Sequence, residues 1–499
     1  MVRSLLFSSI TFLYYFLPAV LVIYYLASAK VKNLILFLAS FVFYLWGEPK
    51  YSVLLLFSVA VGYMGGRCIE YQRQKKCVCA ADPADRSGKY KGGHDRLVVG
   101  IFTAMTLGLL VFFKYMDFLA DSVNRILGIH VPMVQIALPV GISFYTFQII
   151  SYYVDVYRGE VAAEHNFVDF AAYVTMFPQL IAGPIVRFQS VQAELKHREI
   201  TWEKNGEGAA RFVCGLCKKV LIADSLASLI SALQNISETA AKAVVNTGIR
   251  AEGAGIGTLG YWVLALAFML QLYYDFSGYS DMAIGLGKML GFQIPVNFRF
   301  PYISKSVTEF WRRWHITLGR WFRDYVYIPL GGSRKGRLRT MFNLFAVWIL
   351  TALWHGAGYN FLIWGGMLLG ALFLEKLFLL PFLQKSKVIG HVYLLLFVPV
   401  TWMAFTITDV HQLGIYLTRM FPFVNAHTGM VNSMDYIKYL KDYDSLLAMG
   451  VLFATPVPAV IYGRIKRGLL GTLAIAVIFA LSMYYLAVSA NNPFLYFNF

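Results

Sequence analysis

The chain has 499 residues, of which 58% are hydrophobic, 16% aromatic and only 14% charged, and its mean hydropathy is +0.58. Soluble domains average about 25% charged residues, so this composition excludes an ordinary soluble enzyme, and the abundant aromatic residues exclude a disordered chain. Lys and Arg (44) outnumber Asp and Glu (27), which gives a formal net charge of +17. In a membrane protein this excess belongs to cytoplasmic loops, so we expect no nucleic-acid binding.

Apolar runs of about 20 residues recur along the whole chain and predict one all-α, polytopic transmembrane domain, residues 1–499, with about 11–12 transmembrane helices. The first run precedes Ala27-Ser28-Ala29, which resembles a signal-peptidase site, but it is long for a signal peptide and we expect it to be retained. The candidate spans are residues 5–27, 33–47, 51–66, 97–121, 136–157, 220–233, 255–275, 341–358, 360–380, 390–408, 445–463 and 468–490.

Basic residues gather in four connectors, 67–96, 187–219, 299–339 and 464–467. Loops rich in Lys and Arg stay cytoplasmic, so we expect a cytoplasmic basic loop at 67–96, a cytoplasmic interfacial segment at 299–339, and both termini outside. The sequence assigns no role to the 67–96 loop.

Two apolar segments cannot cross the membrane in this topology. Residues 168–186 contain Pro178, Gly183 and Pro184, and residues 276–293 are rich in glycine and follow Asp275. We expect both to be re-entrant or broken. Because broken backbone at membrane depth needs surrounding protein or a water-filled cavity, the two segments predict an internal cavity.

His355 is the first candidate catalytic residue, in the sequence Leu353-Trp354-His355-Gly356-Ala357-Gly358 near the end of an apolar run. An ionisable residue in a spanning helix indicates a functional site. The alternative is a buried neutral imidazole bonded to a backbone carbonyl. Gly356 and Gly358 favour the functional interpretation because glycines let the backbone or a ligand approach the ring closely.

His315 is the second candidate and lies in an aromatic and basic segment. Helical spacing places these residues on one face: Trp311, Trp314, His315, Leu318, Trp321, Phe322 and Tyr325. Such a helix lies in the membrane interface, and a simple anchor explains its Trp and Arg residues but not an imidazole on the apolar face. The Arg face suits an anionic phosphorylated donor such as coenzyme A. The candidate donor-site residues are Arg312, Arg313, Arg320, Arg323 and Trp354.

No metal site is predicted. Cys214 and Cys217 form a CxxC pair, but no second pair or paired histidine accompanies them, so two small apolar helix residues are the better interpretation. The glycines at 278, 285, 287 and 291 lack the strand and Gly-Lys-Ser/Thr of a phosphate loop and favour close helix packing.

Several motifs together resemble the membrane-bound O-acyltransferases (MBOAT), in the branch that contains the membrane subunit of alginate O-acetylation. They are Leu138 to Phe147 (LPVGISFYTF), Phe177 to Pro184 (FPQLIAGP), Gln271 to Gly285 (QLYYDFSGYSDMAIG), Asn297-Phe298 with Pro301-Tyr302, Phe310 to His315 (FWRRWH), Trp321 to Tyr325 (WFRDY) and Trp354 to Ala357 (WHGA). The resemblance covers nearly the whole chain. It implies helices around a thinned central funnel, with His355 as the catalytic residue and His315 as a second essential one.

The resemblance also implies that the protein transfers an acetyl group from a cytoplasmic donor, acetyl-CoA, across a bacterial cytoplasmic (inner) membrane. The acetyl group would serve the O-acetylation of an extracytoplasmic polysaccharide such as alginate. The protein's partners would be the lipid bilayer and an extracytoplasmic SGNH or esterase-like acetyltransferase, with no bound cofactor. Peptidoglycan O-acetylation and D-alanyl transfer to teichoic acid are alternatives. A transporter or flippase, in which His355 is structural or relays protons, is the alternative from a different class.

The C-terminal tail, residues 491–499, is expected at the extracytoplasmic face and is rich in Phe and Tyr. One interpretation is an aromatic belt that anchors the last helix. The other rests on resemblance to terminal motifs of related cell-envelope acylation systems, and makes Tyr496 a candidate acyl relay, with Pro493 freeing the tail from the helix.

Overall fold

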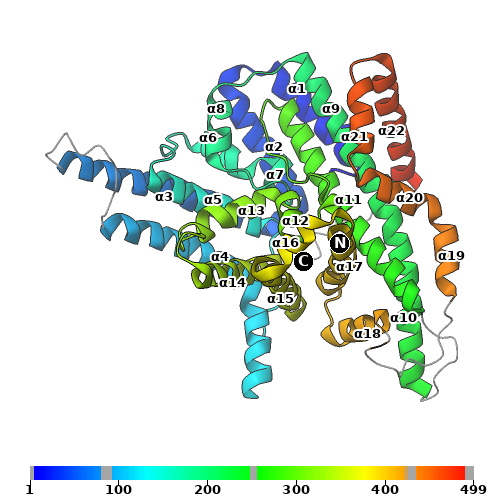
Figure 1. Ribbon diagram of the computed structural model, residues 1–499. Helices are drawn as coiled ribbons and strands as arrows, with labels where there is room; N and C mark the ends of the chain where they lie inside the picture. Colours follow the sequence, from blue (N-terminus) through cyan, green and yellow to red (C-terminus); the bar gives the residue numbers. More distant parts are fainter. Residues whose placement is uncertain (1–4, 80–92, 248–255, 422, 424–433, 489–499) are drawn as a thin grey trace. The chain divides into compact units, whose positions relative to one another are not determined.

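The structure is a computed structural model that describes residues 5–79, 93–247, 256–421, 423 and 434–488 (Figure 1). All regular elements in this described part are helices, as the composition predicts. The chain divides into two units. The first unit comprises residues 1–212, 282–296 and 323–325, and the second comprises residues 213–281, 297–322 and 326–499.

The first unit is built mainly from the N-terminal helices. Within it α2 packs against α6, and α3 packs against both α4 and α5. The helices are η1 (Phe12–Phe16), α1 (Leu17–Leu26), η2 (Ala29–Val31), α2 (Lys32–Gly47), η3 (Pro49–Tyr51), α3 (Ser52–Cys79), α4 (Gly93–Leu127), α5 (Ile142–Arg158), α6 (Phe167–Thr175), α7 (Phe177–Leu180), α8 (Phe188–Lys196) and the greater part of α9 (Trp202–Cys217).

The second unit holds an extensive apolar core, in which α14 packs along α15 and α15 along α17 (Figure 1). Its helices are η4 (Lys218–Ala223), α10 (Asp224–Thr247), most of α11 (Thr258–Met289), η5 (Pro301–Ile303), α12 (Val307–Arg313), α13 (Ile316–Phe322), the last two residues of η6 (Arg323–Tyr327), α14 (Arg337–His355), α15 (Tyr359–Leu374), η7 (Glu375–Leu379), α16 (Leu380–Lys385), α17 (Lys387–Thr406), α18 (Val410–Met420), α19 (Asp435–Asp442), α20 (Asp444–Phe453), α21 (Val457–Ile465) and α22 (Leu469–Val488).

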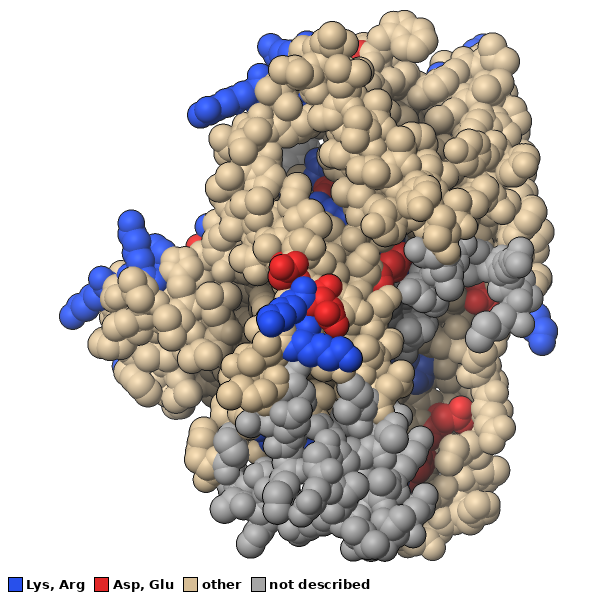
Figure 2. All heavy atoms as spheres, turned by 90° about the vertical axis from the view of Figure 1, so that its right-hand side faces the viewer, with Lys and Arg blue, Asp and Glu red and all other residues tan. Residues whose placement is uncertain are grey.

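Seven helical stretches of the described residues are long and apolar enough to span a membrane. They are 29–47, 49–75, 96–127, 258–289, 359–385, 387–406 and 469–488. The expected span at 445–463 is instead the bent pair α20 and α21, which meet at 73° and would make an eighth. Other expected spans, such as 136–157 and 341–358, are helical but shorter or more polar. On the face shown in Figure 2, Lys, Arg, Asp and Glu occur only in small groups among other residues.

The broken helix expected over 168–186 is confirmed. Asn166 caps α6 by accepting a hydrogen bond from the Val168 amide, and the helix ends before Met176, whose ψ of 110° is not helical. Pro178 then occupies the first turn of the four-residue α7, where a missing N–H is tolerated. This stretch is almost wholly buried, so surrounding protein covers the interrupted backbone.

The break expected over 276–293 is wrong, because α11 runs without interruption to Met289. Its glycines are contact points rather than breaks: a Cβ on Gly278 would lie 2.8 Å from the Gly215 carbonyl oxygen. Its charge is compensated too, since the Lys219 ammonium lies 2.7 Å from the Asp275 carboxylate. Small residues that admit a neighbouring helix, and a lysine that neutralises the acid, let a continuous helix carry a sequence that looked broken.

Two further segments singled out in the sequence are the basic connector 67–96 and the C-terminal tail 491–499. The basic connector 67–96 is helical at both ends, because α3 continues to Cys79 and α4 begins at Gly93. The acyl-relay candidate Tyr496, with the rest of the 491–499 tail, lies outside the described residues.

Candidate active site

His355 is the last residue of α14 and is only 7% exposed. Its ring meets three aromatic rings nearly at right angles: Trp354 at 5.0 Å, Trp364 at 4.9 Å and Phe405 at 5.3 Å between centroids. Trp364 comes from α15 and Phe405 from α17, so three packed helices of the second unit hold this imidazole.

Gly356 makes that packing possible. A Cβ at this position would lie 2.0 Å from Cε2 of Phe361, and the Phe361 ring in turn packs on Phe405. The glycine therefore allows close approach of an aromatic ring just beyond the end of α14, as the sequence suggested, although the approaching group is a side chain of the same chain.

His315 lies where the sequence predicted an uninterrupted helix, and that prediction is wrong. Helix α12 ends at Arg313 and α13 begins at Ile316, and His315 between them has a left-handed φ of +43°. Residues other than Gly adopt this region at a cost of roughly 1–3 kcal/mol, and such residues cluster at functional sites.

Asn297 explains why the helix breaks there. Its backbone carbonyl accepts a hydrogen bond from the Ile316 amide at 3.0 Å. Its side-chain Oδ1 accepts one from the Thr317 amide at 3.1 Å and one from the Thr317 hydroxyl at 2.9 Å. A residue distant in the chain thus supplies the N-terminal cap of α13, which no local sequence pattern reveals.

The same Asn297 oxygen fixes the tautomer of His315. Oδ1 lies 3.2 Å from His315 Nδ1, and the Thr317 amide, which can only donate, identifies this atom as the oxygen. His315 must therefore carry its proton on Nδ1. Its Nε2 is then an unprotonated acceptor, buried and without a hydrogen-bond partner among the described residues. Burial lowers the pKa of His315 to about 3, so the imidazole is neutral at physiological pH.

The two histidines meet at one side chain. The Trp354 indole packs against His315 at 5.8 Å and against His355 at 5.0 Å, so both imidazoles contact the same indole. Trp364 Nε1, beside His355, is buried and has no acceptor in the described part of the chain. The surrounding wall is aromatic and comprises Phe276, Phe298, Trp311, Trp314, Trp348, Trp402 and Phe405.

The candidate donor-site arginines differ in their partners. Arg313 forms a salt bridge with Glu309 at 2.9 Å, and Arg323, in the first unit, pairs with Asp324 at 2.7 Å. Arg312 and Arg320 are exposed and form no salt bridge with the described residues. Of the four, these two remain available to an external anion.

The sequence identified both histidines and Trp354 but missed Asn297 as a site residue and Trp364 altogether. Asn297 was named only as part of a motif that carries the family resemblance. The one signal in the sequence was an amide side chain within an otherwise apolar motif. Trp364 lies on an apolar helix where a tryptophan is unremarkable, so only the fold places its indole against His355.

The fold and site define a polytopic helical membrane protein with two buried histidines packed among aromatic side chains. A family model described as membrane-bound O-acyltransferase matches residues 157–418, which contain both histidines. The probable alginate O-acetylase of Pseudomonas putida is 37% identical over 524 aligned residues, covering 99% of this chain and all of that protein. The corresponding Pseudomonas aeruginosa protein is 44% identical over 369 residues, covering 72% of this chain and 64% of that protein.

A third relative, the peptidoglycan O-acetyltransferase of Helicobacter pylori, is 34% identical over 393 residues, covering 72% of this chain and 68% of that protein. With these similarities, the chain belongs to the membrane-bound O-acyltransferase family, and it is a membrane O-acyltransferase.

Proposed function

We propose that the enzyme transfers an acetyl group from cytoplasmic acetyl-CoA, across the bacterial inner membrane, for O-acetylation of an extracytoplasmic polysaccharide of the alginate type. The full-length similarity to a probable alginate O-acetylase supports the acetyl group and the polymer class. The observation that carries the mechanism is the pair of buried histidines that both contact Trp354.

In the proposed reaction His355 is the general base. It takes the proton of an acceptor hydroxyl while that oxygen attacks the thioester carbonyl carbon. The carbon–sulfur bond breaks, and the departing thiolate receives the proton from the imidazolium. General base catalysis of this kind contributes about 10²–10⁴-fold to a rate. The buried Trp364 indole N–H is a suitable donor for the negative charge that develops on the carbonyl oxygen.

His315 has a different task. A pKa of about 3 makes its imidazole a weak base, whereas the available Nε2 lone pair can accept a hydrogen bond from a donor amide or an acceptor hydroxyl. We assign it to orienting the substrate. Arg312 and Arg320 would hold the phosphates of the donor, because neither is neutralised by a carboxylate of the described residues.

Onward transfer requires an acceptor at the outer face. In the proposal Tyr496 takes the acetyl group as an aryl ester and passes it to a serine of an SGNH or esterase-like partner. Tyr496→Phe should then retain membrane insertion but abolish polymer acetylation in cells. Normal acetylation by this variant would leave the tail as a membrane anchor.

The deciding experiment measures acetyl-CoA hydrolysis and acetyl transfer by purified protein in detergent. His355→Ala should lower turnover by about 10²–10⁴-fold, while His411→Ala, at an exposed histidine of the same unit, should not. Full turnover by the His355→Ala variant would contradict the catalytic role and favour a transporter or flippase. Labelled acetyl groups found on peptidoglycan rather than on a secreted glycan would favour the function named for the Helicobacter pylori relative.

A further inference from the structure

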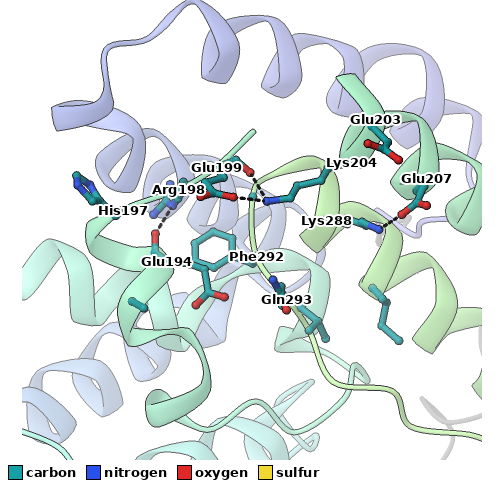
Figure 3. A pocket seen from close by; sticks show the side chains of 14 residues that line it. Glu194, His197, Arg198, Glu199, Glu203, Lys204, Glu207, Lys288, Phe292 and Gln293 are labelled. Carbon is teal, nitrogen blue, oxygen red and sulfur yellow. Dashed lines mark hydrogen bonds and ion pairs between the residues drawn. The ribbon is translucent and has the colours of Figure 1, made fainter. Parts of the chain in front are cut away.

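A cavity of about 890 Å³ lies in the first unit and shares no lining residue with the histidine site. It is formed by the end of α8, the segment 197–199, the start of α9, the end of α11 and the segment 291–294 (Figure 3). Its volume falls in the range of about 300–1,000 Å³ that is usual for small-molecule sites. Its lining is rich in charged side chains, unlike the aromatic surroundings of His315 and His355.

Most of these charges are neutralised by one another. Lys204 pairs with Glu199 at 2.8 Å, and Lys288 pairs with Glu207, as the dashed lines in Figure 3 show. Arg198 is different, because its guanidinium has no carboxylate partner among the described residues.

Arg198 is held firmly by neutral groups. Its Nε donates to the Glu194 carbonyl oxygen at 2.8 Å, and its Nη1 donates to the Tyr24 hydroxyl at 2.7 Å. The guanidinium lies 4.4 Å from the centroid of the Phe292 ring. Its Nη2 is buried and has no acceptor in the described part of the chain. A fixed, charged guanidinium with one nitrogen unused is a preorganised anion site.

A second cation reinforces this charge. Lys32 Nζ lies 4.9 Å from the centroid of the Tyr24 ring, which the Arg198 guanidinium also approaches, at 5.9 Å. No carboxylate of the described residues forms a salt bridge with Lys32. These two cations approach the same tyrosine ring and repel each other, and an anion bound beside them would relieve that repulsion.

Two membrane-spanning helices end at this place. Helix α2 begins at Lys32 and α11 ends at Met289, and both belong to stretches able to span a membrane. The hydroxyls of Tyr24 and Tyr25 donate to the carbonyls of Leu290 and Met289, at 2.6 and 2.9 Å. Span ends with Tyr and Lys side chains lie in the headgroup layer of a bilayer, so the cavity lies at the depth of lipid phosphates.

We propose that this cavity binds a phospholipid headgroup, with the lipid phosphate held by Arg198 of its lining and attracted by the charge of Lys32, which approaches the same Tyr24 ring. Basic pockets beside spanning helices bind lipid headgroups in this way. The carboxylate of Glu194 points away from the guanidinium in Figure 3 and suits the ammonium of an ethanolamine headgroup. The site is separate from acetyl transfer and does not depend on that proposal.

Native mass spectrometry of the detergent-purified full chain, titrated with phosphatidylethanolamine, tests the proposal. Arg198→Gln should weaken lipid binding by about tenfold or more, and Arg198→Lys, which keeps the charge but not the planar fork, should lie between. Lys204→Gln removes the same charge from a paired lysine of the same cavity and should bind like the unmodified protein. Equal binding by Arg198→Gln and Lys204→Gln would overturn the assignment.

The source of the phosphate is decided in the same assay. Glycerophosphoethanolamine, which lacks acyl chains, should neither bind at matched concentration nor displace the lipid. Binding of this soluble ester as tightly as the lipid would overturn the lipid as ligand. Melting of the lipid-free variants in detergent, measured in parallel, separates lost binding from lost folding.

Discussion

Replacing Asn297 by aspartate tests the link between this residue and His315 with almost no change in shape. The carboxylate keeps an acceptor for the Thr317 amide and hydroxyl, so the cap of α13 is retained. What changes is charge, because an anion would now lie about 3.2 Å from His315 Nδ1.

The magnitude follows from that distance and from the burial of the imidazole. Burial holds the pKa of His315 at about 3, and an adjacent opposite charge raises a pKa by roughly 1–3. The pKa of His315 should therefore rise into the region of roughly 4–6. Protonation then removes the Nε2 lone pair at mildly acidic pH, where the unmodified protein keeps it.

The assay is kcat/KM for acetyl-CoA turnover between pH 5 and pH 9. The unmodified protein should show no loss attributable to His315 in this range, whereas Asn297→Asp should lose activity as the pH falls toward 5 and recover it above pH 7. Asn297→Ala should lose activity at every pH and lose about 2–5 kcal/mol of stability, because it leaves buried donors unpaired. A uniform loss in Asn297→Asp, with an unchanged pH profile, would refute the role in setting the state of His315.

Two further substitutions probe the support of the site. Lys219→Met should destabilise the protein by about 3–5 kcal/mol, because Lys219 forms salt bridges with Asp224 at 2.8 Å and Asp275 at 2.7 Å. Thermal melting in detergent measures this loss. Adding Asp224→Asn and Asp275→Asn to the same variant should restore the stability. Gly356→Ala should lower kcat by up to about 100-fold with the fold retained, because its Cβ would displace the Phe361 ring; unchanged kcat would show that this contact does not position His355.

Sequence patterns predicted the class of fold because a membrane-spanning helix is recognised by its average hydropathy over about 20 residues. That average does not depend on which apolar residues make up the run. Sequence patterns failed where a distant partner decides the outcome. The segment after Asp275 looked broken because its glycines and acids are costly alone in a membrane, yet Lys219 and the Gly215 backbone lie against them. The break at 168–186 was predictable because Pro178 acts through its own backbone.

The same distinction applies to the site. His315 and His355 stood out as candidates because an ionisable side chain on an apolar face is costly wherever it lies. The local conformation of His315 was not predictable, since helical spacing alone gives a continuous face through Trp314 and His315. The interruption depends on backbone and side-chain hydrogen bonds from Asn297, which sequence spacing cannot report.

The left-handed backbone at His315 and the contacts of Trp354 indicate that the two histidines have different roles in the proposed reaction. A helix continuing through residue 315 would satisfy its backbone within α12 and α13 and would leave Asn297 without its three donors. The break instead lets Asn297 fix the proton on Nδ1 and leaves a neutral Nε2 on an imidazole that, like His355, contacts Trp354. An imidazole fixed in this way accepts a hydrogen bond but exchanges protons poorly near neutrality. In the proposed mechanism proton transfer is therefore left to His355, and the strain at His315 is the cost of holding a substrate group rather than of moving a proton.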